Sequence, residues 1–204
     1  MNIIEKKTDI SLDELEYFLK QEYVSVDTET TGLNYRTDKL CTIQLFAGDL
    51  GIILKYSIST PYDNLKSLFL SNKVTKIFHN AVFDVSFLMN NLALERFGKL
   101  VCTKISSKII SGLDHNNSLK ILLYKYLNVS IDKQEQMSDW SKDNLSKSQK
   151  MYAINDVRYL LPLWEKLRQE LEDRGRCEIA YSCFGFIPTY KLMTDMEIDN
   201  IFKY

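Results

Sequence analysis

YVSVDTET, residues 23–30, is the segment that indicates the fold class. Its apolar and β-branched residues predict a β-strand, in which alternate side chains share one face. Asp27 and Glu29 stand two positions apart near the end of this strand, so we expect both carboxylates to point the same way. Two carboxylates that converge repel each other unless they are protonated or share a cation. Hard oxygen ligands of this kind suit Mg²⁺ or Mn²⁺.

The residues on both sides of this strand predict further strands and helices. Ser11 and Glu14 form a capping-box pattern, which predicts that an amphipathic helix begins there. A polar turn at Asp49 joins two predicted strands as a hairpin. Thr60 and Pro61 suit the first positions of the next helix. In chain order, we expect strands over 41–48, 51–56, 74–79 and 99–103 and helices over 60–70 and 80–91.

The second half of the chain has mainly helical patterns. Ser146 and Gln149 form another capping box, which predicts one long helix that ends near Gly175. The segment RCEIAYSCFGFI, residues 176–187, is rich in apolar and aromatic residues, and we expect Pro188 to break its pattern. Shorter helices are expected over 104–112 and 118–127. Together these elements predict an α/β fold, with a mixed five-stranded sheet flanked by helices and a helical C-terminal part.

Asp84 lies inside an otherwise apolar helical segment, HNAVFDVSFL, residues 79–88. Asp is a poor helix former and is seldom buried without a partner. The segment alone leaves two alternatives open: a solvent-facing side chain on an amphipathic helix, or a member of a site. Asp27 and Glu29 also leave two alternatives open, a metal site or a solvated strand end, because Asp-x-Glu is common at such strand ends.

Tyr152 and Asp156 are four residues apart in YAINDVRYL, residues 152–160. On a helix this spacing places both side chains on one face. The phenol could then orient a water held beside a metal bound to Asp156. The alternative is a tyrosine packed between helices and an exposed aspartate.

Composition limits the class of protein. The chain has 204 residues, of which 45% are hydrophobic and 26% charged, as in an ordinary globular domain. No apolar run is long enough for a membrane span and no signal peptide is apparent, so we expect a cytoplasmic protein without membrane contact. The net charge is −1, whereas proteins that hold long nucleic acids typically have a strongly positive net charge. Four cysteines without a C-x-x-C pair, and two histidines, argue against a zinc site.

The three acidic segments, taken in order, resemble the exonuclease motifs of the DEDD superfamily in its tyrosine-bearing branch, whose fold is ribonuclease H-like. Residues 138–167 resemble ribonuclease D. The segments CTIQL (41–45), VCTKISSKI (101–109), DKQEQMSDW (132–140) and RCEIAYSCFGFIPTYKL (176–192) resemble the shorter nano-RNase C family of alphaproteobacteria. The resemblance covers nearly the whole chain, and departs at Cys102, where an Asp is common. It implies an exonuclease domain over 1–187 and a C-terminal tail, 188–204, in oligomer contacts.

The resemblance also implies a mechanism with two divalent ions, Mg²⁺ or Mn²⁺. Asp27, Glu29 and Asp156 would hold one ion, Asp27 would bridge to the second, and Asp84 would support that second ion. Tyr152 would orient the attacking water, because a phenol with an ordinary pKa near 10 is a poor base at neutral pH. The product would be a nucleoside 5′-monophosphate.

The family resemblance further suggests which residues contact the substrate. A leucine at the position of Leu33 wedges between two bases in related enzymes, although a loop leucine that anchors the turn after Gly32 is equally compatible with the sequence. The other candidates for substrate contacts are Thr30, His79, Asn80, Gln44 and Lys104. His79 alone is more typical of a structural role.

The substrate class implied by the resemblance is very short RNA, above all diribonucleotides, and the assembly implied is a ring-shaped homo-octamer in a bacterial, alphaproteobacterial cytoplasm. Two alternatives remain open. One is a general ribonuclease D-like exonuclease on longer RNA, tRNA 3′ ends or DNA, which would share all five catalytic residues. The other is a nucleotide-binding scaffold without activity. The aromatic segment with Tyr181, Phe184, Phe186 and Ile187 is compatible with an oligomer surface or with core packing.

Overall fold

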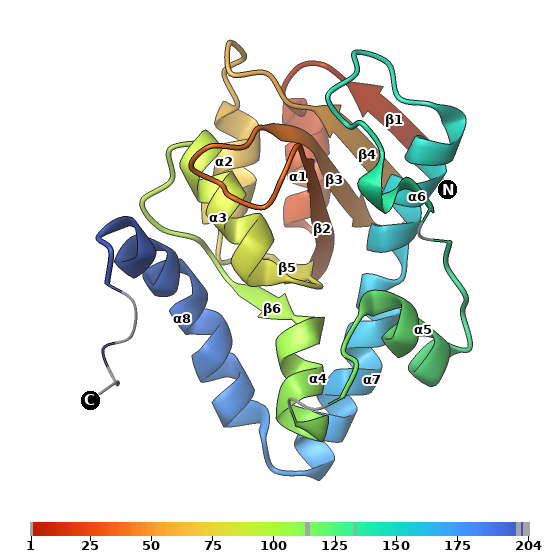
Figure 1. The fold of residues 1–204 in the computed structure, drawn as a ribbon, viewed down its shortest axis with the longest axis vertical. Coiled ribbons are helices and arrows are strands. Elements are labelled where there is room, and N and C mark those ends of the chain that lie inside the picture. The colour runs from red at the N-terminus through yellow and green to blue at the C-terminus, as the bar shows by residue number, and fades with distance from the viewer. Residues whose placement is uncertain (1, 113–114, 133, 199–200, 202–204) are drawn as a thin grey trace.

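The computed structural model describes residues 2–112, 115–132, 134–198 and 201. A twisted sheet lies among helices, and a further group of helices extends beyond one end of it (Figure 1). The strands are β1 (Asn2–Lys6), β2 (Tyr23–Thr30), β3 (Leu40–Ala47), β4 (Leu50–Lys55), β5 (Thr75–Phe78) and β6 (Leu100–Cys102). The helices are α1 (Leu12–Leu19), α2 (Asp63–Leu70), α3 (Ala81–Asn91), α4 (Thr103–Ser111), α5 (Leu119–Leu127), the short 3₁₀ helix η1 (Gln134–Met137), α6 (Lys147–Arg158), α7 (Leu160–Asp173) and α8 (Cys177–Asp195).

The sheet has the order β1-β4-β3-β2-β5-β6 and is mixed. The pairs β1–β4, β2–β5 and β5–β6 are parallel, whereas β4–β3 and β3–β2 are antiparallel. The predicted α/β fold with a mixed sheet is confirmed, but the sheet has one strand more than the predicted five. The additional strand is β1, whose side chains are only partly buried at the sheet edge, so its sequence lacks a clear buried pattern.

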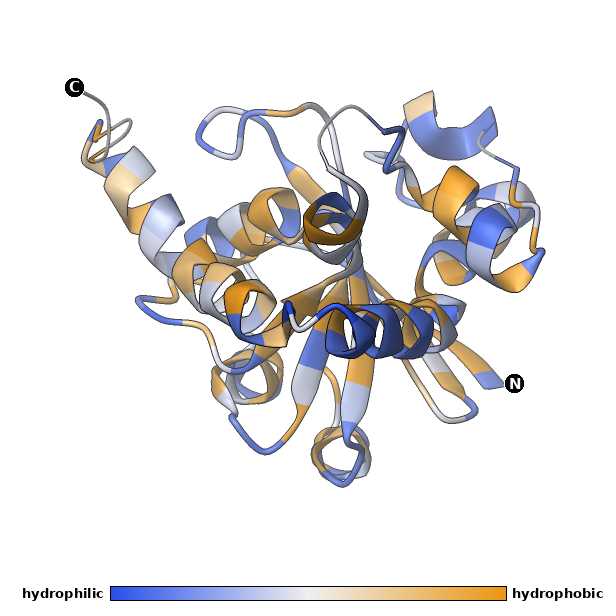
Figure 2. Ribbon diagram, turned by 90° about the horizontal axis from the view of Figure 1, so that it is seen from below, coloured by the Kyte–Doolittle hydropathy of each residue, from blue (hydrophilic) through white to orange (hydrophobic). Residues whose placement is uncertain are grey.

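Both faces of the sheet are covered by helices. Ile52 and Ile53 are neighbours on β4 and both are buried, yet they belong to two different hydrophobic clusters. Ile53 lies in the cluster that contains Ala153 and Ile154 of α6, whereas Ile52 lies in the main core. Figure 2 shows hydrophobic residues concentrated in the strands and the surrounding helices, with mostly hydrophilic loops between them. Within the described ranges, we find no helix that has both the length and the apolar character to cross a membrane.

Helix α2 begins at Asp63, later than the predicted start at residues 60–61. The carboxylate of Asp9 accepts hydrogen bonds from the backbone N–H groups of Asn64 (2.8 Å) and Leu65 (3.1 Å). These are donors in the first turn of a helix, which have no partner within the helix itself. Because Asp9 is distant in the sequence, the local pattern around α2 could not indicate this cap.

The long helix predicted after the second capping box is two helices, α6 and α7, which meet at Tyr159. Pro162 explains the break, because in a continuous helix it could not donate to the carbonyl of Arg158 and its ring would clash with that group. As the third residue of α7, Pro162 occupies a position whose N–H would lack a helical partner. Both predicted capping boxes, at Ser11 and Ser146, are present.

Helix α8 continues through Pro188 to Asp195, so the expectation that Pro188 breaks this pattern is wrong. The buried residues of α8 lie on both sides of the proline: Ala180, Phe184, Ile187 and Lys191. Burial of one large apolar side chain contributes roughly 1.5–3 kcal/mol, which is comparable with the cost of about 3 kcal/mol for an internal proline. Tyr181 and Phe186, by contrast, are exposed, so the aromatic segment is divided between core and surface.

Candidate active site

Strand β2 and helix α6 bring three carboxylates to one point. Asp27 and Glu29 share a face of β2, as the alternation predicts, and α6 packs across β2, β3 and β4. One carboxylate oxygen from each of Asp27, Glu29 and Asp156 lies within 4.8 Å of the others. Three hard oxygen donors at this separation are a suitable set for one divalent cation.

Tyr152 lies beside this group, one helical turn before Asp156 on α6. Its ring is buried and contacts Trp140 with the ring centroids 5.9 Å apart. A hydrogen bond with Asp156 is one of the causes that raise the pKa of the Tyr152 hydroxyl. The predicted shared face of the two side chains is therefore present, and the phenol points towards the acidic group.

Asp84 lies against strand β2, just beyond the residues of β2 that pair with β5. The pairing of β2 with β5 reaches Ser25, and beyond it the N–H of Thr28 donates to Oδ1 of Asp84 at 3.1 Å. The hydroxyl of Thr28 donates to the same oxygen at 2.7 Å, and both residues are buried. Asp84 is therefore a buried acid with a partner, and not the solvent-facing residue of the alternative interpretation. Two donors fix one of its oxygens, which orients the whole carboxylate.

Burial and mutual repulsion raise the pKa values of these acids. Burial, followed by the neighbouring carboxylates, raises the pKa of Asp27 well above its usual range and that of Glu29 to about 9. Burial also raises the pKa of Asp84 to about 7. A divalent cation would compensate the repulsion and allow these groups to ionise together. The acidic group thus fits a metal, and clustered pKa shifts of this size are typical of functional sites.

Without metal, we expect the melting temperature of the protein to fall as pH rises from about 5 to 9. Glu29 and Asp84 keep their protons to higher pH in the folded protein, where their pKa values are about 9 and about 7, than in the unfolded chain, where they are ordinary. The folded state therefore binds more protons in this window. The free energy of unfolding contributed by these groups decreases with pH through the folded pKa values.

Thermal unfolding across this pH range, with and without Mg²⁺, measures the effect. The stabilisation by Mg²⁺ should increase with pH, because the metal competes with protons for the same oxygens. The variant Glu29→Gln, which cannot ionise, should show a flatter dependence in the metal-free protein. A Mg²⁺ stabilisation that is independent of pH would contradict this electrostatic description.

A cleft of about 520 Å³ opens over the acidic group. Five of the six candidate substrate residues from the sequence line it: Thr30, Leu33, His79, Asn80 and Lys104. In the cleft, the charge of Lys104 lowers the pKa of Asp84 against the larger effect of burial, which raises it. Nδ1 of His79 lies 2.9 Å from Oγ1 of Thr103, so the protein holds the imidazole ring in place.

Gln44, unlike the other candidate substrate residues, does not line the cleft. Gln44 lies opposite Asp27 on the central strand β3 and is fully buried, and its Nε2 donates to Oγ1 of Thr42 at 2.7 Å. Since β3 lies between β2 and β4 and α6 packs against it, the structure covers this side chain and does not expose it to the cleft.

Several residues of the cleft were not indicated by the sequence: Thr28, Phe83, Ser118, Leu119, Gln136, Met137 and Ser138. Thr28 lies between the two acids of β2 in the sequence. Its hydroxyl donates to Asp84 only because α3 packs beside β2, and the sequence does not show this packing. The residues around η1 reach the cleft through a connection whose course no local pattern predicts.

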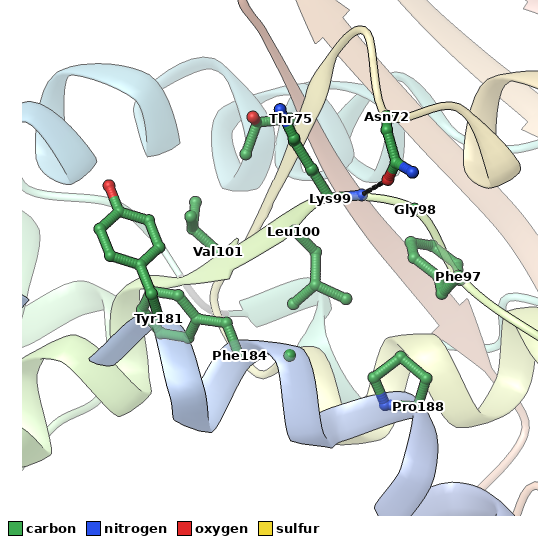
Figure 3. Close-up of a pocket in the computed structure, with 11 residues that line it drawn as sticks. Asn72, Thr75, Phe97, Gly98, Lys99, Leu100, Val101, Tyr181, Phe184 and Pro188 are labelled. Atoms are coloured by element: carbon green, nitrogen blue, oxygen red, sulfur yellow. Dashed lines mark hydrogen bonds between the residues drawn. The ribbon is translucent and has the colours of Figure 1, made fainter. Parts of the chain in front are cut away.

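A second cavity, of about 310 Å³, lies between β6 and α8 and has a different lining (Figure 3). Its residues include Phe97, Leu100, Phe184 and Pro188, and the N–H of Lys99 donates to Oδ1 of Asn72 at its rim. None of the described residues that line this cavity carries a carboxylate. It therefore lacks the groups that could hold a metal, and the cleft over Asp27 remains the candidate active site.

Comparisons with known proteins identify relatives of this chain among nucleases. Ribonuclease D of Haemophilus influenzae is 34% identical over 151 residues, which cover 72% of this chain and 37% of that protein. The chain thus spans about two fifths of the length of the curated relatives that it matches.

Among solved structures, NrnC of Brucella melitensis superposes with a TM-score of 0.88 and 35% identity, covering 100% of both chains. Structures of the same protein bound to pGG and with bound Mg²⁺ match at 34% identity, with TM-scores of 0.88 and 0.86. Each covers 100% of this chain and 99% or 100% of the other. A sequence family described as 3′-5′ exonuclease matches residues 3–172. Since that match includes the acids on β2, α3 and α6 and extends over most of the chain, this protein belongs to the 3′-5′ exonuclease family.

Proposed function

We propose that the protein is a metal-dependent 3′→5′ exoribonuclease that hydrolyses very short RNA, chiefly diribonucleotides, to nucleoside 5′-monophosphates. The observation that carries the proposal is the convergence of Asp27, Glu29 and Asp156 in a cleft that Tyr152 also lines. Membership of the exonuclease family supports the reaction. The likeness over the full chain to a protein with bound pGG supports the short substrate.

In this proposal Asp27, Glu29 and Asp156 hold one divalent ion, Mg²⁺ or Mn²⁺. Asp84 supports a second ion through the carboxylate oxygen that Thr28 does not occupy. Bound divalent ions of this kind lower the pKa of water and neutralise charge on the transferring phosphate. The contribution of the chain is to hold four acids ready in a cleft, so that little reorganisation is needed when substrate binds.

Tyr152 is proposed to position the attacking water. Burial and the neighbouring Asp156 raise the pKa of its hydroxyl, so the phenol is neutral at physiological pH. A neutral phenol donates one hydrogen bond and accepts another, and can therefore fix the orientation of a water molecule without removing its proton.

The charge of the cleft favours a short substrate. Lys104 is the one Lys or Arg among its described lining residues, whereas four acids face the same space. Proteins that hold long nucleic acids usually neutralise many phosphates with basic side chains. Few phosphates can be neutralised here, which suits a dinucleotide better than a long strand.

Replacement of Thr28 by valine is expected to weaken the support for Asp84. The valine keeps the size of the side chain and the backbone N–H, and removes the 2.7 Å bond from the hydroxyl. A hydrogen bond to a charged group contributes about 1.5–3 kcal/mol, so we expect a loss of activity of about ten- to a hundredfold and a higher Mg²⁺ requirement. Activity measured against Mg²⁺ concentration tests this, with Thr28→Ser as the control that restores the bond. Equal activity of both variants would contradict the role of the hydroxyl.

The direction of degradation and the product test the proposed reaction. RNA labelled at its 5′ end should shorten progressively in Mg²⁺, whereas RNA labelled at its 3′ end should release labelled mononucleotide at once. Chromatography should identify nucleoside 5′-monophosphates. Release of 3′-monophosphates, or degradation from the 5′ end, would exclude the proposed mechanism, and no cleavage of any nucleic acid in Mg²⁺ or Mn²⁺ would favour the inactive scaffold.

We also propose the homo-octamer that the family resemblance implies, with residues 188–204 in its contacts. The exposed aromatic residues of α8 support a contact surface: Tyr181, Phe186 and Tyr190. Residues 199–200 and 202–204 lie outside the described residues. Light scattering coupled to size-exclusion chromatography tests this assembly, and a monomeric mass would contradict it.

A further inference from the structure

Two strongly exposed apolar side chains line the cleft over the acids. Leu33 is 85% exposed and Met137 is 93% exposed, and both line the cleft over the acids. The other aliphatic or aromatic residues there, Phe83, Leu119 and Tyr152, are packed in or against the hydrophobic clusters. Among the described residues, Ile58 is the one other large hydrophobic residue that is exposed to this extent, at 90%, and it lies outside the cleft.

The segment that carries Leu33 is anchored to α3, the helix of Asp84. The hydroxyl of Thr30 donates to the carbonyl of Gly32 at 2.6 Å, immediately before Leu33. Further along, Nδ2 of Asn90 on α3 donates to the carbonyl of Tyr35 at 3.0 Å. The backbone around Leu33 is therefore held in place while its side chain projects into solvent.

Met137 is anchored in a similar way to α6, the helix of Asp156. The side chain of Gln149, in the first turn of α6, donates to Oγ of Ser138 at 2.9 Å and to the carbonyl of Asp139 at 3.1 Å. These bonds fix the chain directly after Met137. The two exposed apolar side chains thus belong to segments fixed on the two helices that supply acids to the site.

An ordered segment that presents an apolar side chain to water is suited to bind a flat apolar surface. The side chain can be buried on binding, and little backbone entropy is lost because the segment is already fixed. The faces of nucleobases are such surfaces, and methionine sulfur makes favourable contacts with aromatic rings. Contacts with the face of a base do not depend on its identity, since every base has one.

We infer that Met137 contacts the face of a substrate base and, together with Leu33, brackets the bases of a short oligonucleotide over the acidic group. This inference rests on the proposed function and assigns Met137 as a residue that determines substrate affinity. Because the proposed contact of Met137 is with a base and not with the reacting phosphate, its loss affects binding more than the chemical step. Affinity should also vary little with base sequence.

Kinetics on a dinucleotide test the assignment. Met137→Ala should raise KM about five- to tenfold, as expected for the loss of a contact with an aromatic ring, and should leave kcat nearly unchanged. Met137→Leu should keep most of the affinity. The matched control is Ile58→Ala, which removes an equally exposed apolar side chain outside the cleft and should not change KM. Thermal unfolding of each variant shows that the fold is retained.

A fluorescent substrate supplies a second measurement. A dinucleotide that contains 2-aminopurine changes its fluorescence when the base is stacked, and slow turnover in the Tyr152→Phe background allows binding to be followed. Met137→Ala in that background should reduce the change. Parental KM and fluorescence in the Met137→Ala variants, or equal effects of Ile58→Ala, would overturn the inference while wild-type hydrolysis continues. Absence of hydrolysis by the wild type would instead refute the proposed function.

Discussion

Asp156→Ala is expected to abolish turnover, with a fall in kcat of at least about a thousandfold, the scale seen when an essential member of a catalytic group is removed. Asp156 supplies one of the three oxygens that lie within 4.8 Å of one another, so its loss leaves an incomplete set of ligands. The variant should fold. Removal of one of several neighbouring buried acids also relieves their repulsion, so the metal-free melting temperature should equal or exceed that of the parent.

Hydrolysis of a dinucleotide and thermal unfolding, each with and without Mg²⁺, measure both effects. The matched control is Asp143→Ala, which removes an exposed aspartate from the connection before α6 and should change neither activity nor the response to Mg²⁺. If Asp156→Ala retained parental activity, the assignment of the metal site would be wrong. If it unfolded instead, the acid would have a structural role that the electrostatics do not predict.

Tyr152→Phe should lower kcat by about a hundredfold, the scale on which loss of a positioned proton donor or acceptor acts. The phenylalanine keeps the ring that packs against Trp140 and removes the hydroxyl beside Asp156. Since the acids remain, stabilisation by Mg²⁺ should be retained. A loss of activity with intact metal stabilisation therefore distinguishes Tyr152 from the proposed metal ligands.

The control for this substitution is Tyr124→Phe, which removes a hydroxyl from an exposed tyrosine on α5 outside the cleft. It should have parental kinetics. Two results would contradict the role of Tyr152: parental turnover in Tyr152→Phe, or loss of its stabilisation by Mg²⁺.

The parts of the site that the sequence predicts depend on local periodicity. The two-residue spacing of Asp27 and Glu29 places both on one face of β2, and the four-residue spacing of Tyr152 and Asp156 places both on one face of α6. These two arrangements follow from the side-chain periodicity of a strand or a helix and do not depend on tertiary contacts. The capping box at Ser146 likewise predicts where α6 begins.

The parts that the sequence does not predict depend on distant contacts. Asp9 caps α2 across a long separation, and Gln44 is buried because α6 covers β3. Thr28 reaches Asp84 because α3 takes the place beside β2 where β5 ends. Met137 lines the cleft because Gln149 ties the neighbouring residues to α6. Each of these depends on tertiary packing, which overrides or adds to local preference.

The measurement that tests the central proposal most directly is a time course of RNA degradation in Mg²⁺, with 5′-labelled substrates of two, three, seven and twenty nucleotides compared side by side. The proposal predicts that the dinucleotide disappears far faster than the longer substrates and yields nucleoside 5′-monophosphates. The same preparation of Asp156→Ala should degrade none of them. If all lengths shortened at similar rates from the 3′ end, the preference for dinucleotides would be contradicted and a general exonuclease would remain.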